Sequence, residues 1–189
     1  MSKTAKITLG VVIAVVLLLV IFFASSYNGM VSARTEAEGA FANIDTQLQR
    51  RFDLIPNLVE TVKGASAQEQ NIINSVTEAR ARYTNAGSVS EKAEAASDFS
   101  SALSRLMVVV ENYPTITSTQ SYIALQDELA GTENRINIAR QDYNDAVRAY
   151  NTSIRRFPNV IVAGIFGFDQ MAYFEAAAGS QSAPQVSFQ

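Results

Sequence analysis

The sequence predicts an all-α protein in which an N-terminal transmembrane helix precedes an antiparallel, up-and-down four-helix bundle. An uncharged, apolar run near the N-terminus indicates the membrane helix. Beyond it, apolar residues recur at alternating steps of three and four, the spacing of helices that bury one stripe, and almost no stretch alternates with the period of a strand. The predicted divisions are a cytoplasmic N-terminus (1–6), a transmembrane helix (7–27), the bundle (28–157), an apolar C-terminal segment with a short helix (158–178) and a tail (179–189).

The composition excludes several classes of function. The 189 residues suit one domain, and the chain has no Cys and no His. Zinc-thiolate sites, imidazole ligands and His-activated nucleophiles are therefore excluded. The formal net charge of -3 argues against nucleic acid as a partner, because that affinity depends on clustered Lys and Arg. We expect no cofactor, no metal site and no enzymatic activity, and a hydrolase that relies on carboxylates alone has no motif in its favour.

The transmembrane helix is predicted over residues 7–27. No charge occurs between Lys6 and Arg34, and roughly 20 helical residues cross the hydrocarbon core of a bilayer. Lys3 and Lys6 bias the N-terminus toward the cytoplasm, which places the bundle outside. The alternative is a signal peptide cleaved near residues 24–26, although the apolar run is longer than most signal-peptide cores.

Four helical stripes follow the membrane helix. Three consist of Ala37, Phe41, Ile44 and Leu48; of Ile55, Leu58, Val62, Ile72, Val76, Ala79 and Tyr83; and of Phe99, Leu103, Leu106, Val110 and Tyr113. The fourth runs from Tyr122 to Phe157, where large residues at one heptad position face small ones at its partner, which favours a bundle. A turn is predicted over residues 87–90, with Ser90 as the N-cap of the next helix. Pro114 is predicted to end the helix before it.

Pro56 leaves one architectural question open, because it either kinks one long helix or lies in the first turn of a new helix capped by Asp53. A single helix from Met30 to Tyr83 would be about 80 Å long, and the last helix would then overshoot its partners. We favour a break near Pro56, which makes four helices of comparable length.

Ordered motifs along the chain resemble the LemA family. They are Arg50 to Val59, Glu111 to Pro114, Leu125-Gln126, Thr132 to Asn134, Ala139-Arg140, Tyr143-Asn144, Tyr150-Asn151, Phe157-Pro158 and Pro184 to Phe188. The resemblance implies a bacterial single-span membrane protein with an antiparallel helical bundle and no established catalytic activity. Some relatives are linked to membrane remodelling, including the biogenesis of magnetosome membranes. Many members carry a His-Glu pair where this chain has Gln68-Glu69, which speaks against His-dependent metal or proton chemistry here.

Arg51 and Glu133 are predicted to form an ion pair in the bundle core. Arg51 falls on the core-facing stripe between Leu48 and Ile55, and Glu133 lies on the core edge of the last helix. A buried guanidinium needs a carboxylate to offset its desolvation, and such a pair fixes the register of two helices more than it stabilises them. The alternative is that Arg51 extends to solvent near a helix end.

A stripe of uncharged polar side chains on the last helix is a candidate interface. Asn137, Asn144 and Asn151 repeat every seven residues beside Tyr143 and Tyr150. Amides can pair between helices without the desolvation cost of charges, and Tyr is common at contact surfaces. The alternative is a solvated flank of the bundle.

The apolar segment from Pro158 to Phe168 is a second candidate contact surface, followed by a short helix expected over residues 169–178. Its residues proposed to meet the membrane or another subunit are Ile161, Ile165, Phe166 and Phe168. If the last helix returns toward the bilayer, this segment lies in the membrane interface or in a groove of a neighbouring subunit. Otherwise it folds back and caps the bundle, which we favour.

Together these features predict a non-enzymatic scaffold in the bacterial cytoplasmic (inner) membrane. It would self-associate as a homo-oligomer and organise the lipid bilayer or other membrane proteins. The alternative is a monomeric, membrane-tethered sensor or adaptor that binds a partner protein.

Overall fold

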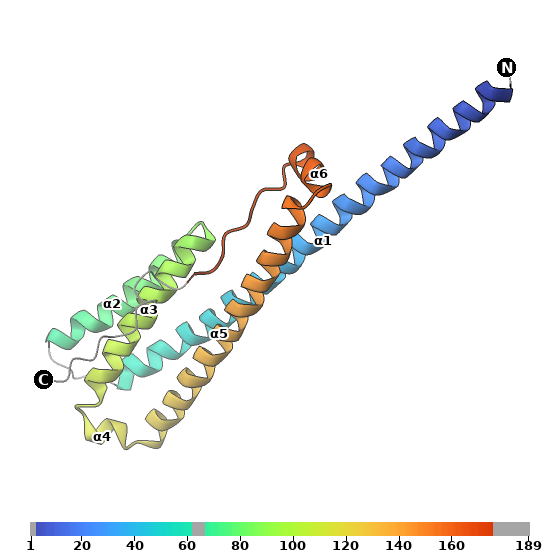
Figure 1. Ribbon diagram of the computed structural model, residues 1–189. Helices are drawn as coiled ribbons and strands as arrows, with labels where there is room; N and C mark the ends of the chain where they lie inside the picture. Colours follow the sequence, from blue (N-terminus) through green and yellow to red (C-terminus); the bar gives the residue numbers. More distant parts are fainter. Residues whose placement is uncertain (1–2, 62–66, 176–189) are drawn as a thin grey trace, which may run out of the picture. The chain divides into compact units, whose positions relative to one another are not determined.

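The computed structural model describes residues 3–61 and 67–175, and these form six helices and no strand (Figure 1). The helices are α1 (Lys3–Thr61), α2 (Ala67–Asn85), α3 (Val89–Val110), α4 (Pro114–Thr117), α5 (Gln120–Arg155) and α6 (Asn159–Phe166). The predicted all-α class is therefore confirmed. The chain divides into an anchor unit, Met1–Ala40 with Asn144–Met171, and a core unit, Phe41–Tyr143 with Ala172–Gln189.

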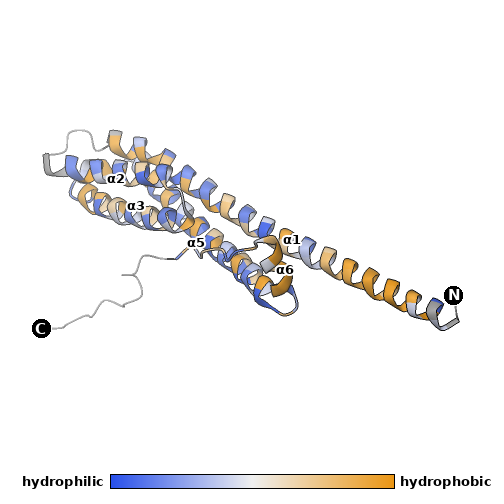
Figure 2. Cartoon of the chain, turned by 90° about the horizontal axis from the view of Figure 1, so that it is seen from above, coloured by the Kyte–Doolittle hydropathy of each residue, from blue (hydrophilic) through white to orange (hydrophobic). Residues whose placement is uncertain are grey.

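Beyond its first turns, the N-terminal part of α1 is apolar, as the hydrophobic colour of this stretch in Figure 2 shows. The large apolar side chains from Ile7 to Ile21 are all exposed. A helix that is apolar all round and not covered by protein is suited to lipid. Within the described residues, α1 is the one helix long and apolar enough to cross a membrane.

The helix α1 continues through Pro56 and ends at Thr61, so the predicted break near Pro56 is wrong. Proline inside a helix removes one backbone hydrogen bond and crowds the preceding turn, at a cost of about 3 kcal/mol. Here the residues around it, Phe52, Ile55 and Leu58, are buried. Their burial offsets the cost, since each buried side chain of this size stabilises by about 1.5–3 kcal/mol.

In the core unit, α1, α2, α3 and α5 lie side by side (Figures 1 and 2). Phe52 of α1 is at the centre, with its ring 5.3 Å from that of Tyr83 on α2 and 4.6 Å from that of Phe99 on α3. Edge-to-face contacts of this kind add to the stabilisation from burial. Other fully buried core residues are Ile44, Leu48, Val76, Leu106, Val110 and Ile136.

The helix α5 has the length that its heptad pattern predicts but begins and ends two residues earlier. Its large heptad residues are buried, namely Tyr122, Leu129, Ile136, Tyr143 and Tyr150. Phe157 was predicted to continue this stripe and does not, because the helix ends at Arg155 and the Phe157 side chain is 76% exposed.

The N-cap of α3 is Ser88 rather than the predicted Ser90. The Ser88 hydroxyl accepts a hydrogen bond from the Glu91 amide at 3.2 Å, and the Glu91 carboxylate accepts one from the Ser88 amide at 3.1 Å. This reciprocal capping box satisfies amides at the start of the helix that have no partner within it. Ser90 instead lies in the first turn of the helix.

The short helix near the C-terminus is α6, and it precedes the predicted range of residues 169–178. It ends at Gly167, whose φ of 71° is left-handed and favours glycine. Residues 168–175 have no helical structure, and residues 176–178 lie outside the described residues, as does the predicted tail. The helix comes earlier because the apolar run itself is helical and the glycine stops it.

Replacing Ser88 with Ala should lower the free energy of unfolding by about 0.5–2 kcal/mol, because a helix N-cap bond is lost. Ser90→Ala, two residues away, is the matched control and should change it by less than about 0.5 kcal/mol. Thermal unfolding followed by circular dichroism measures both. Equal losses in the two variants would contradict the assignment of the cap to Ser88.

Candidate functional site

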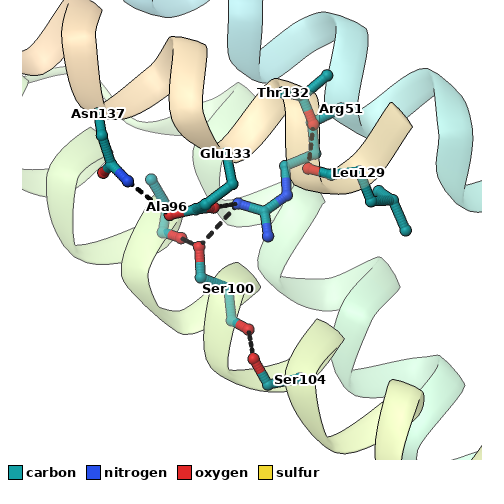
Figure 3. A network of polar contacts seen from close by, with 8 residues as sticks. All are labelled: Arg51, Ala96, Ser100, Ser104, Leu129, Thr132, Glu133 and Asn137. Atoms are coloured by element: carbon teal, nitrogen blue, oxygen red, sulfur yellow. Dashed lines mark hydrogen bonds and ion pairs between the residues drawn. The ribbon is translucent and has the colours of Figure 1, made fainter. Parts of the chain in front are cut away.

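Arg51 lies at the centre of a polar network that joins three helices of the core unit (Figure 3). Its Nη1 atom donates to Glu133 of α5 and, at 3.2 Å, to the hydroxyl of Ser100 on α3. The Ser100 hydroxyl in turn donates to the backbone carbonyl of Ala96 at 3.0 Å. The structure thus brings the predicted partners Arg51 and Glu133 together, and it adds α3 to the contact.

The two charges of this pair have different access to water. The Arg51 side chain is 8% exposed and that of Glu133 is 40% exposed. Burial lowers the pKa of Arg51, and the charge of Glu133 opposes that shift. A guanidinium remains protonated in proteins even so. The buried cation therefore depends on Glu133, whereas Glu133 is partly solvated and depends less on the cation.

The charge of Glu133 also acts on a second guanidinium, that of Arg140. Burial lowers the pKa of Arg140, Glu133 raises it, and the charge of Arg51 lowers it further. The Arg140 guanidinium also lies 5.0 Å from the centre of the Phe174 ring. Two buried or half-buried cations near one carboxylate suit a structural role, because a guanidinium stays protonated in proteins.

A second polar cluster in the core unit joins α1, α2 and α3. Asp45 accepts hydrogen bonds from the Tyr83 hydroxyl and from the Lys92 ammonium, the latter at 2.9 and 3.0 Å. Burial, together with Asp45, raises the pKa of Tyr83. The Lys92 ammonium also lies 5.1 Å from the Phe41 ring centre. Sequence reasoning missed this cluster, since nothing in the spacing of the three polar residues indicates that they meet.

Three residues of the predicted interface stripe form hydrogen bonds with the backbone of their own chain. Tyr150 donates to the backbone carbonyl of Asp169 at 2.9 Å, and Asn151 exchanges two hydrogen bonds of 2.9 Å with the backbone of Met171. In the core unit, Tyr143 donates to the carbonyl of Ala172 at 2.7 Å.

All three side chains are buried, so the prediction that Tyr143, Tyr150 and Asn151 contact another molecule is wrong. They bind the extended segment after α6 instead. Asn137 is exposed, donates to Glu133 at 3.4 Å and stays a predicted interface residue, as does the half-buried Asn144.

The predicted contact residues of the C-terminal apolar segment separate into an inner and an outer group. Phe168 is half-buried and packs with Met30 and Tyr150 in the anchor unit. Ile161, Ile165 and Phe166 are exposed. One side of this segment thus packs on the anchor unit, and the other side is uncovered.

Within the described ranges, no three acidic side chains come close enough to hold a metal ion. The side chains of Gln68 and Glu69, where many LemA members carry a His-Glu pair, lie outside the described residues. The polar groups described above connect helices through hydrogen bonds and ion pairs. Arg51 and Asp45, both on α1, are at the centres of these two clusters.

A sequence model of the LemA family matches residues 40–188 of this chain. The magnetosome proteins MamQ 1 and MamQ 2 of Paramagnetospirillum magneticum are each 32% identical to it, over 79% of this chain and 64% of theirs. MamQ of Magnetospirillum gryphiswaldense is 31% identical, over 81% of this chain and 66% of its own. The chain therefore matches slightly less than two thirds of the length of these relatives.

Glu133→Gln should lower the free energy of unfolding by about 1–3 kcal/mol, because it leaves the buried Arg51 charge without its carboxylate. Arg51→Met should cost less, since the remaining Glu133 is partly hydrated, and the double variant should recover part of the loss. Arg50→Met is the matched control, because Arg50 also pairs with a carboxylate of α5 but is exposed. Denaturant unfolding measures all four, and a loss in Arg51→Met equal to that in Glu133→Gln would contradict this asymmetry.

Asn151→Ala should release the segment after α6 from α5. The Met171 amide loses its acceptor, so its hydrogen exchange should accelerate on the order of tenfold, the ratio that corresponds to one lost hydrogen bond. Asn137→Ala is the control from the same stripe and should leave the Met171 amide unchanged. Unaltered exchange in Asn151→Ala would show that other contacts hold the segment.

Proposed function

Because this chain belongs to the LemA family and is a membrane-associated helical protein, we propose that it is a non-enzymatic scaffold anchored by α1. It self-associates and organises the bilayer or other membrane proteins. The observation that carries the proposal is the continuity of α1, which supplies both the apolar membrane helix and one helix of the core unit. A protein whose anchor is also part of its folded core is suited to acting by contact at the membrane.

The relatives also support a role at a membrane. Both organisms contribute proteins whose names place them in the magnetosome. By analogy, this chain acts on a membrane or on proteins held in one, and its own setting is the bacterial cytoplasmic membrane. Lys3 and Lys6 before the membrane helix favour a cytoplasmic N-terminus, with the core unit on the other side.

Self-association is proposed to use the exposed part of the polar stripe on α5. Asn137 is exposed and uncharged, with the exposed apolar Ile138 beside it. Uncharged polar and apolar side chains lose less hydration energy than charged ones when a contact forms.

The second candidate is a monomeric adaptor, and one observation favours it. A surface cleft of about 500 Å³ lies between α2 and α3, lined by residues that include Arg82, Glu91 and Asp98. Oligomeric state separates the adaptor from the scaffold.

We expect the full-length protein in lipid nanodiscs or detergent to have a mass of two or more chains. Asn137→Cys should form a disulfide-linked dimer on mild oxidation, and Ser101→Cys, exposed on α3, should not; the chain has no other Cys. A single-chain mass without cross-links at any concentration would refute the scaffold and favour the adaptor. A multiple mass with cross-links through Ser101→Cys alone would keep self-association and move its surface to α3.

A further inference from the structure

The outer side of α6 is an apolar surface that no part of the described anchor unit covers. Ile165 is 63% exposed, Phe166 54% and Ile161 51%. Val160 and, just before the helix, Phe157 are exposed as well. No charged residue occurs between Arg156 and Asp169. Figure 2 shows the same hydrophobic colour on α6 as on the N-terminal part of α1.

The inner side of α6 fixes the helix beside α1 at one level. Val162 and Ala163 are buried in a cluster with Met30 of α1, and Phe22 and Phe23 pack against that cluster. Phe166, although 54% exposed, also contacts α1 with one edge, its ring centre 4.9 Å from that of Tyr27. These contacts join α6 to the stretch of α1 from residue 22 to residue 30.

A hydrogen bond marks the same level at the start of α6. The Ser26 hydroxyl donates to the Asn159 side-chain oxygen at 3.0 Å. Aromatic and polar contacts together therefore determine where along α1 the helix α6 sits, and leave its outer side free.

That level coincides with the end of the membrane crossing. The uncharged part of α1 runs from Ile7 to Ala33, about 40 Å of helix, whereas the hydrocarbon core is about 30 Å thick. A crossing of roughly 20 residues that begins at Ile7 ends at Ser26. Ser26 is the residue that bonds to α6, so a crossing that begins directly after Lys6 would set α6 at the level where the acyl chains meet the headgroups.

The residues that flank α6 suit a headgroup layer. Arg155 and Arg156 are exposed directly before it, and lipid phosphates attract such cations. Apolar side chains on one side of a short helix with basic residues beside them are typical of helices that lie in the membrane interface. The exposed side of α6 also continues the exposed apolar surface of α1, which the bilayer already covers.

We infer that α6 is a second membrane contact, which lies in the interface with Ile161, Ile165 and Phe166 inserted among the acyl chains of the leaflet where α1 ends. The occupant of this surface is lipid rather than a second copy of the chain. The inference rests on the proposed membrane anchoring by α1. It assigns to the anchor unit a bilayer contact separate from the crossing itself.

Depth-dependent quenching tests this contact, because the chain has no Trp and one introduced Trp reports one position. The full-length protein is reconstituted into phosphatidylcholine bilayers whose acyl chains carry bromine either near the headgroup or near the chain end. Ile165→Trp is the test variant and Ile161→Trp a second one on the same surface. Val15→Trp, within the crossing, is the positive control.

Ala149→Trp is the negative control. Ala149 is exposed on α5 in the same unit, directly after Arg148, which forms an exposed ion pair with Asp145.

We expect bromine near the headgroup to quench Trp at positions 165 and 161. This quenching should be at least half as strong as the quenching of Trp at position 15 by bromine near the chain end. Trp at position 149 should be unquenched by either lipid. Quenching at positions 165 and 161 no greater than at position 149 would overturn the inference while leaving the anchor intact.

Two further results would also be decisive. Absence of quenching at position 15 would refute the membrane crossing and the inference with it. Unquenched emission at position 165 that shifts to the blue as the ratio of protein to lipid rises would assign the surface to a second copy and overturn the contact with lipid.

Discussion

One helix has to satisfy two different environments, and the rest of the structure depends on how it does so. In lipid every backbone polar group needs a partner within the segment, which a helix provides. The helix α1 satisfies its backbone groups in this way and carries apolar side chains all round in its N-terminal part, and from Met30 onward it changes to a single buried stripe. Each unit is then built on its own part of α1. The helix α6 packs on it in the anchor unit, and α2, α3 and α5 contact it in the core unit.

The core unit adds directional bonds to this apolar packing. Apolar side chains tolerate a slip of one helix along another, whereas a guanidinium bonded to Glu133 and Ser100 does not. The second centre, Asp45, binds Tyr83 and Lys92 in the same way. Both centres lie on α1, so they orient the other helices with respect to it. A buried ion pair is weak evidence of stability, but it selects one arrangement among several that bury similar area.

The segment after α6 binds several of the polar side chains on α5. Tyr143, Tyr150 and Asn151 have the composition of a contact surface, and they do make a contact, with the backbone of their own chain. Their use inside the chain removes them from any surface available to a partner. Of the surfaces predicted to make contacts, the one around Asn137 and the outer side of α6 are exposed in the described residues, and they carry the two proposals made for this protein.

Local pattern was sufficient for the helical class, the membrane helix, the length of α5 and the family, because each depends on residues close together in the sequence. The pairing of Arg51 with Glu133 was also predictable, since an arginine on an apolar stripe requires a carboxylate. Only the tertiary structure decided the rest. Burial of Phe52, Ile55 and Leu58 carries α1 through Pro56, where local preference favours a break. Asp45 meets Lys92, and Asn151 meets Met171, because folding brings distant segments together, and neither contact leaves a periodic signal in the sequence.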